Sequence, residues 1–357
     1  MATTMTPELG VIEGYFGRPW RHEDRKQVLT RLRGLGFSYF HYAPKADAFL
    51  RRRWREPHPD AALAELAELS AHCRSLGLRF GAGLSPYELY RDFSGPARDA
   101  FVAKLRSLDA IGLDDLAILF DDTRGDVAGL AALEAEIVHI AQAHTRARRV
   151  LMCPTYYSDD RMLDIVFGPR PAGYLEDLGR RLDPRVGVYW TGEEICTREF
   201  GPGHLARVAD QLRRKPTLWD NYPVNDGPRM SRFLHLRGFT GRPSVIGPHI
   251  AAHAINPALQ PHLTLIPAAT LVAAYRQGQG YVYMSAFREA AHAQAGDELA
   301  AMLEEDLHAL QGRGLDQLGE DRARLRARYA AVDHPMAAEL LRWLDGADTV
   351  DGWIEDA

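Results

Sequence analysis

Short apolar runs alternate with segments of helical periodicity along most of this sequence, and that alternation restricts the possible folds more than any other feature. We predict eight strands, each followed by a helix, within roughly 265 residues. The predicted strands are residues 9–14, 37–42, 78–84, 116–120, 150–153, 186–191, 217–219 and 249–255. The predicted helices are residues 23–35, 61–76, 96–111, 130–144, 174–182, 204–214, 230–236 and 263–275. Eight such units are typical of a closed parallel (β/α)8 barrel, the TIM barrel of the α/β class.

A doubly wound parallel sheet is the competing architecture of the same class. That fold needs no eighth strand, and it is expected to carry a glycine-rich phosphate loop between a strand and a helix. The sequence Gly81-Ala82-Gly83 is a weak match to such a loop, because it lies inside a predicted strand. The barrel is therefore the favoured fold.

The sequence changes character after residue 277, where charged segments rich in Ala, Leu and Arg begin. Residues 297–311, 321–329 and 336–344 have helical periodicity. We therefore predict two parts, a barrel domain and a C-terminal α-helical segment. They comprise residues 1–278 and 279–357.

The composition excludes several classes of function. The chain has 43 Lys and Arg against 48 Asp and Glu, a net charge of −5, so it offers no basic footprint for nucleic acid. We expect no membrane partner, because no run approaches the ~18 apolar residues of a spanning helix and no N-terminal apolar leader is present. The three cysteines, Cys73, Cys153 and Cys196, lack metal-ligand spacing and are odd in number, which favours a reduced cytoplasmic location.

The fourth predicted strand ends in two adjacent carboxylates, Asp121 and Asp122. Side chains of adjacent strand residues point to opposite faces, so both can face one pocket only where the strand ends. Two close carboxylates repel each other when both are ionised, so their pKa values separate and the pair can supply one acid and one anion. Taken alone, such a pair is more often structural, as a strand end and helix N-cap, or metal-binding than catalytic.

Polar or aromatic residues also follow the other predicted strands, at the ends that meet on one face of a barrel. They are Glu13, Gly14, Lys45, Ser85, Tyr156, Tyr157, Trp190, Thr191, Trp219, Asp220, Asn221, Asp226 and Asn256. Each alone has a simple explanation as a surface, rim or turn residue. Together they supply hydroxyl-binding groups beside aromatic walls, which is what a sugar pocket needs, because sugars carry hydroxyls on the rim and C–H groups on the faces.

Six motifs occur in order along the chain: GVIEGYFGRPW at residues 10–20, YAPK at 42–45, LFDD at 119–122, CPT at 153–155, WTG at 190–192 and WDNYPVND at 219–226. With these motifs the chain resembles glycoside hydrolase family 84, the family of O-GlcNAcases and bacterial β-N-acetylglucosaminidases. The resemblance implies a retaining exo-β-N-acetylglucosaminidase without a cofactor or metal. In that mechanism the substrate's own 2-acetamido oxygen is the nucleophile and an oxazoline forms, so the rule relating carboxyl separation to stereochemistry does not apply.

The resemblance also implies roles for individual residues. Asp121 would stay ionised and stabilise the charge that develops on the acetamido group, and Asp122 would protonate the leaving oxygen and then act as base on water. The implied substrate-binding residues are Tyr157 and Asn221 for the acetamido group, Trp219 and Cys153 as its walls, and Gly14, Lys45, Asp226 and Asn256 for hydroxyls. The implied partner is a glycan or glycopeptide that bears N-acetylglucosamine.

The chain departs from the family pattern at three places: Tyr15 and Phe16 stand in reversed order, Ala46 replaces a frequent acidic residue, and Gly227 replaces a common aromatic residue. Because these positions flank matched residues, we expect them to affect the fit of the aglycone more than the chemistry. Helical segments in relatives can pair across a dimer, so a homodimer through the C-terminal helices is a further expectation.

Two other functions remain as hypotheses. The first is a glycan-binding pseudoenzyme of the same fold, against which the intact Asp pair, Lys45 and Tyr157 argue. The second is a metal-dependent hydrolase with Asp121 and Asp122 as ligands, but the sequence places no ordered set of histidines near them.

Overall fold

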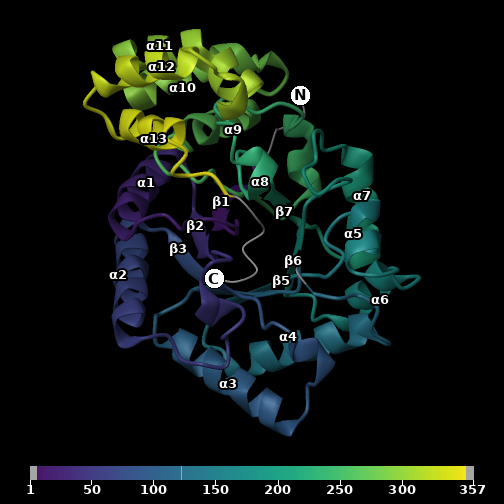
Figure 1. Ribbon diagram of the computed structural model, residues 1–357. Coiled ribbons are helices and arrows are strands. Elements are labelled where there is room, and N and C mark those ends of the chain that lie inside the picture. Colours follow the sequence, from purple (N-terminus) through teal and green to yellow (C-terminus); the bar gives the residue numbers. More distant parts are fainter. Residues whose placement is uncertain (1–5, 122, 351–357) are drawn as a thin grey trace.

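The structure, a computed structural model, describes residues 6–121 and 123–350. Its centre is a closed barrel of parallel strands that follow one another in chain order, β1 to β8 (Figure 1). The strands are β1 (Glu8–Glu13), β2 (Tyr39–Tyr42), β3 (Arg79–Leu84), β4 (Asp115–Leu119), β5 (Arg149–Cys153), β6 (Gly187–Trp190), β7 (Thr217–Asp220) and β8 (Ala252–Ile255). The predicted (β/α)8 barrel is therefore confirmed.

Helices surround the barrel and cover its outer face (Figure 1). They are α1 (His22–Leu35), α2 (Asp60–Leu76), α3 (Gly95–Asp109), α4 (Leu130–His144), α5 (Arg161–Val166), α6 (Tyr174–Arg181), α7 (Pro202–Leu212), α8 (Gly227–Met230) and α9 (Leu265–Gln277). Side chains along a strand point alternately to its two faces, so the apolar residues of each strand fall into two cores, one inside the barrel and one between strands and helices. In β1, Leu9 and Val11 pack in the layer between strands and helices, whereas Ile12 packs inside the barrel.

Side chains fill the interior of the barrel, as expected for eight strands. At the amino-terminal end of β4, Asp115 is buried and its Oδ2 lies 3.0 Å from His41 Nε2 and 3.1 Å from Arg79 Nε. Burial by itself would raise the pKa of Asp115, but His41 and Arg79 hold it below its usual value. This network closes one end of the barrel, so the opposite end, where the strands finish, is left for a site.

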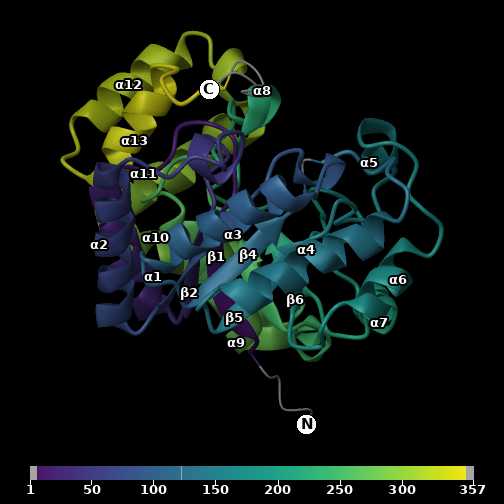
Figure 2. The ribbon, with the colours of Figure 1, turned by 90° about the horizontal axis from the view of Figure 1, so that it is seen from below.

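The C-terminal helices gather on one side of the barrel, beside α9 (green to yellow in Figure 1). They are α10 (Tyr283–Ala295), α11 (Asp297–Leu307), α12 (Asp321–Ala330) and α13 (Pro335–Leu344). Figure 2 shows α12 and α13 near α8, which follows β7, toward one end of the barrel. Within the part of the chain that the structure describes, none of the helices has the length and apolar character that crossing a bilayer requires.

Hydrogen bonds fix α13 to the loops that follow β7 and β8. The carboxylate of Glu339 accepts the backbone N–H groups of His262 and Leu263, each at 2.9 Å. Trp343 Nε1 donates to the carbonyl of Ser231 at 3.1 Å. The end of the helical segment therefore contributes to the carboxyl-terminal face of the barrel.

The predicted helix over residues 230–236 is wrong, since α8 ends at Met230. The backbone that follows pairs with the C-terminal segment instead of with itself: Leu234 N–H donates to Leu310 at 3.1 Å, and Leu315 N–H donates to Arg232 at 2.8 Å. Helix α5 was not predicted, because six residues are too few to show a helical period.

Candidate active site

A buried lysine and a buried carboxylate meet where β2 and β4 end. The Lys45 ammonium lies 2.5 Å from Asp121 Oδ2, and the two side chains are 3% and 11% exposed. The backbone N–H of Lys45 donates to the carbonyl of Tyr15 at 3.1 Å, which fixes this loop against the one after β1. A charge-assisted contact of this kind stabilises the ionised carboxylate in a site with little water.

Asp122, the predicted acid, lies outside the described residues. Thr123 is buried, and its hydroxyl lies within hydrogen-bond distance of two acceptors, the carbonyl of Phe120 at 2.8 Å and the hydroxyl oxygen of Thr155 at 2.7 Å. The Thr155 hydroxyl and N–H both donate to Glu134 Oε1, at 2.7 and 3.1 Å. The loop after β4 is thus connected to a carboxyl group buried in α4.

An amide network joins the ends of β1, β7 and β8. Asn221 Oδ1 accepts from Trp219 Nε1 at 3.1 Å and from Asn256 Nδ2 at 3.0 Å. Asn256 Oδ1 in turn accepts the backbone N–H of Gly14 at 3.2 Å. Asn221 Nδ2 donates to the carbonyl of Ile195 at 2.7 Å. These bonds fix the orientation of both amides. Among the residues that the structure describes, they leave the second amide hydrogen of Asn221 for a ligand.

Trp219 is the central wall of the site. Its ring packs edge-on against Tyr189, with centroids 5.3 Å apart, in the same buried cluster as Cys153. Tyr157 is partly buried and packs on that cluster. Lys45 Nζ lies 5.9 Å from the centroid of the Trp219 ring, so the tryptophan borders both the ion pair and the amide network.

Two further sequence-predicted residues lie at the same rim. Asp226, at the N-terminus of α8, accepts the backbone N–H of Phe16 through Oδ2 at 2.8 Å, which connects the loops after β7 and β1. Gly14 approaches Trp219 so closely that a Cβ at this position would lie 2.2 Å from Trp219 Cζ2. Every predicted site residue that the structure describes therefore lies at the carboxyl-terminal end of the barrel.

Two ion pairs behind the site were not predicted. The guanidinium of Arg25 binds Glu13 through two hydrogen bonds of 2.7 and 2.8 Å, directly before Gly14. Asp220 Oδ2 accepts from Arg242 Nε at 2.8 Å and lies 2.9 Å from His253 Nε2. Burial would raise the pKa of Asp220, but these two partners hold it below its usual value. The pairs lock the strand ends that carry the site.

The alternation of strand residues is a signal that could have revealed this support. In β7, Trp219 points into the barrel, so its neighbour Asp220 must point outward into the layer under the helices. A carboxylate buried there requires a partner with the opposite charge. The need for a partner is readable from the sequence, although its identity is not.

A family model matches most of the chain. Residues 9–310 match the beta-N-acetylglucosaminidase family. The chain is 28% identical over 283 residues to protein O-GlcNAcase of Rattus norvegicus, and equally to that of Mus musculus, with 76% of this chain covered. It spans about 30% of the length of these relatives.

Among solved structures, a mutant of O-GlcNAc hydrolase from Thermobaculum terrenum is similar, with a TM-score of 0.78 and 25% sequence identity. The match covers 94% of this chain and 80% of that chain. The family match extends through the whole barrel and includes all the strand ends that form the candidate site. The chain belongs to the beta-N-acetylglucosaminidase family, glycoside hydrolase family 84.

Proposed function

We propose that this protein is a retaining exo-β-N-acetylglucosaminidase that hydrolyses terminal β-linked N-acetylglucosamine by substrate assistance. The observation that carries the proposal is the 2.5 Å contact between Lys45 and Asp121 in a site walled by Trp219. This lysine keeps a carboxylate anionic where the acetamido group of a sugar would lie. The family supplies the class of substrate.

The first step forms a ring within the substrate. The acetamido oxygen attacks the anomeric carbon while Asp122 gives its proton to the glycosidic oxygen. The bond between the anomeric carbon and the glycosidic oxygen breaks. Asp121 accepts a hydrogen bond from the acetamido N–H and stabilises the positive charge that develops there. Because the nucleophile belongs to the substrate, its proximity to the anomeric carbon costs no separate association step.

The second step returns the protein to its starting state. Asp122, now ionised, takes a proton from water, and the water oxygen attacks the anomeric carbon as the oxazoline ring opens. Two displacements at one carbon give overall retention of configuration. Asn221 and Tyr157 position the acetamido group, while Trp219 and Cys153 form the walls of its pocket.

Hydrolysis of 4-nitrophenyl β-N-acetylglucosaminide tests this function. We expect NMR to show the β-anomer as the first product, and a rate that falls steadily as the acetamido methyl is fluorinated, because fluorine weakens the nucleophile. A rate independent of fluorination would contradict substrate assistance. Binding of the sugar without any turnover would favour the glycan-binding pseudoenzyme.

A metal-dependent hydrolase is less compatible with the site, because the Lys45 ammonium already contacts Asp121 as a cation would. Chelator treatment distinguishes a metal-dependent hydrolase from the proposed enzyme, since only a metal enzyme would lose activity.

The physiological aglycone, protein or oligosaccharide, is tested by comparing activity on a glycopeptide and on a free disaccharide.

Three further expectations, on domains, oligomeric state and cellular location, also stand as proposals. Residues 1–278 and 279–357 are proposed as two domains, testable by limited proteolysis. The proposed homodimer would have to use other surfaces than the apolar faces of α11 and α12, because Leu303, Leu307 and Tyr329 are buried within the chain. Light scattering tests the dimer. Cellular fractionation tests the proposed cytoplasmic location.

A further inference from the structure

Glu134 is a carboxyl group buried in α4 without a counter-charge. The residue is 0% exposed, and it makes no ion pair with the part of the chain that the structure describes. Its Oε1 atom accepts the hydroxyl and the N–H of Thr155, at 2.7 and 3.1 Å, and its Oε2 atom lies 2.5 Å from the Tyr174 hydroxyl. Burying a carboxyl group without a cation is costly. An apolar residue at this position would avoid that cost, so the carboxyl group needs an explanation beyond packing.

Thr155 connects this carboxyl group to the loop after β4. Its hydroxyl has one hydrogen, which it donates to Glu134, so its oxygen is left as an acceptor for the Thr123 hydroxyl at 2.7 Å. A proton on the carboxyl group would lie on Oε2, beside Tyr174, because Oε1 already accepts both bonds from Thr155. Glu134 therefore fixes the direction of the bond between the two threonines in either protonation state.

Thr123 stands next to Asp122 in the chain and closes the loop that carries both aspartates. Its N–H donates to the carbonyl of Phe120 at 3.2 Å, and its hydroxyl oxygen lies 2.8 Å from the same carbonyl. The N–H of Phe120 in turn donates to the carbonyl of Cys153 at 2.8 Å. Hydrogen bonds therefore connect the loop to the end of β5 both before and after the aspartates, and the connection after them depends on Glu134.

We propose that Glu134 is a positioning residue for the acid step: through the two threonines it holds Asp122 at the glycosidic oxygen. The inference rests on the proposed function, since the placement of Asp122 matters in this way only if it protonates a leaving group. Proton transfer needs the two heavy atoms within hydrogen-bond reach, and a misplacement of about 1 Å can cost roughly 10²-fold in rate. Glu134 and Thr155 are both 0% exposed, so neither touches the substrate.

The test compares methyl β-N-acetylglucosaminide, whose leaving group needs a proton, with 4-nitrophenyl β-N-acetylglucosaminide, whose leaving group does not. The readout is the ratio of kcat/KM on the 4-nitrophenyl glycoside to kcat/KM on the methyl glycoside. Thr155→Val removes the hydroxyl and keeps the N–H bond to Glu134, and we expect it to raise this ratio about tenfold. Glu134→Leu should raise the ratio by a similar factor. Glu134→Gln should keep the wild-type ratio, because its amide oxygen still accepts from Thr155.

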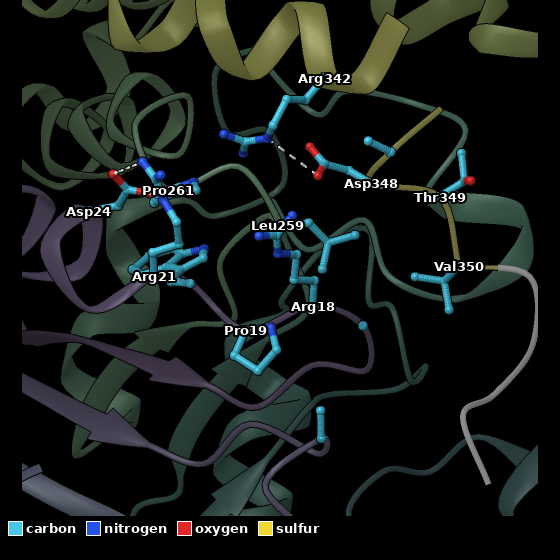
Figure 3. A pocket seen from close by; sticks show the side chains of 14 residues that line it. Arg18, Pro19, Arg21, Asp24, Leu259, Pro261, Arg342, Asp348, Thr349 and Val350 are labelled. Atoms are coloured by element: carbon cyan, nitrogen blue, oxygen red, sulfur yellow. Dashed lines mark hydrogen bonds and ion pairs between the residues drawn. The ribbon is translucent and has the colours of Figure 1, made fainter. Parts of the chain in front are cut away.

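Two control variants remove hydrogen bonds to carboxylates elsewhere. Thr145→Val removes the hydroxyl that donates to Asp109 at 2.8 Å, at the C-terminal end of α4. Arg21→Gln removes the ion pair with Asp24 at 2.7 Å, in a pocket beside the loop after β1, on the same face of the barrel as the candidate site (Figure 3). Neither variant should change the ratio.

An unchanged ratio in Thr155→Val, with a native circular dichroism spectrum, would overturn the inference. An equal loss on both glycosides would overturn it too, because a merely structural role slows both alike. The same holds if Glu134→Gln raises the ratio as much as Glu134→Leu does. In these cases the wild type still hydrolyses the aryl glycoside, so the proposed function stands. If the wild type hydrolyses neither glycoside, the proposed function fails and the inference fails with it.

Discussion

Lys45 Nζ lies 2.5 Å from Asp121 Oδ2 and 5.9 Å from the centroid of the Trp219 ring. These two contacts join the ends of β2, β4 and β7 through one side chain. The lysine places a positive charge beside the carboxylate and sets its position relative to the aromatic wall. Charge and shape in the candidate site therefore depend on the same residue.

Replacing Lys45 by Met tests this dependence. Methionine fills similar space but carries no charge, so Asp121 loses the ammonium group that lies beside it. The site also loses a group that binds a sugar hydroxyl. We expect kcat/KM on an aryl glycoside to fall by roughly 10²-fold to 10³-fold, the usual cost of one preorganised electrostatic contact. Circular dichroism should show a folded protein. Activity within threefold of the wild type would contradict the role of Lys45.

The two aspartates should differ in their dependence on the leaving group. A substrate with a poor leaving group needs a proton from Asp122. Asp122→Asn should therefore lower kcat on such a substrate by about 10³-fold, within the range of general acid catalysis. An activated aryl glycoside leaves without help and should lose far less. Asp121→Asn should slow both substrates alike, because it acts on the acetamido group. Equal losses in Asp122→Asn would remove the acid role.

The barrel and the residues of the candidate site could be predicted because their signals are local. Each strand is a short apolar run, and the carboxyl ends of parallel strands meet at one face, so strand-end residues such as Lys45 and Asn221 were expected to share a site. The segment 230–236 could not be predicted, because its backbone partners Leu310 and Leu315 lie in the C-terminal segment. Apolar periodicity does not report such distant pairing.

The same limit applies to the support behind the site. Asp220 finds Arg242 and His253 only once the strands are assembled. Long-range charge pairing is therefore the part of the site that sequence reasoning misses.

Gly14 gives a steric prediction with a matched control. In Gly14→Ala the new methyl group would lie 2.2 Å from Trp219 Cζ2, so the ring must move and its bond to Asn221 is lost. We expect a loss of about 1–3 kcal/mol in unfolding free energy from overpacking, together with a large rise in KM. Gly34→Ala in α1 meets nothing within 4 Å, and it should stabilise the helix slightly without changing activity. Equal behaviour of the two variants would contradict the close packing at Gly14.

Glu134 gives a prediction about pH. It is fully buried in α4, where it accepts from Thr155 and Tyr174, and burial raises its pKa to about 7. In the unfolded chain the carboxyl ionises near 4.5, so between pH 4.5 and 7 the folded state binds more protons than the unfolded state. Stability contributed by this group is therefore greatest below that window and falls as pH rises through it, by up to roughly 3 kcal/mol.

Glu134→Gln removes this titration while keeping an acceptor for Thr155 and a donor for Tyr174. Urea unfolding at pH 5 and pH 8 should show the wild type losing stability relative to the variant at the higher pH. Glu136→Gln, an exposed change on the same helix, should follow the wild type at both pH values. If wild type and Glu134→Gln keep a constant difference across the window, Glu134 is already ionised at pH 5 in the folded protein, and its hydrogen bonds outweigh the cost of burial.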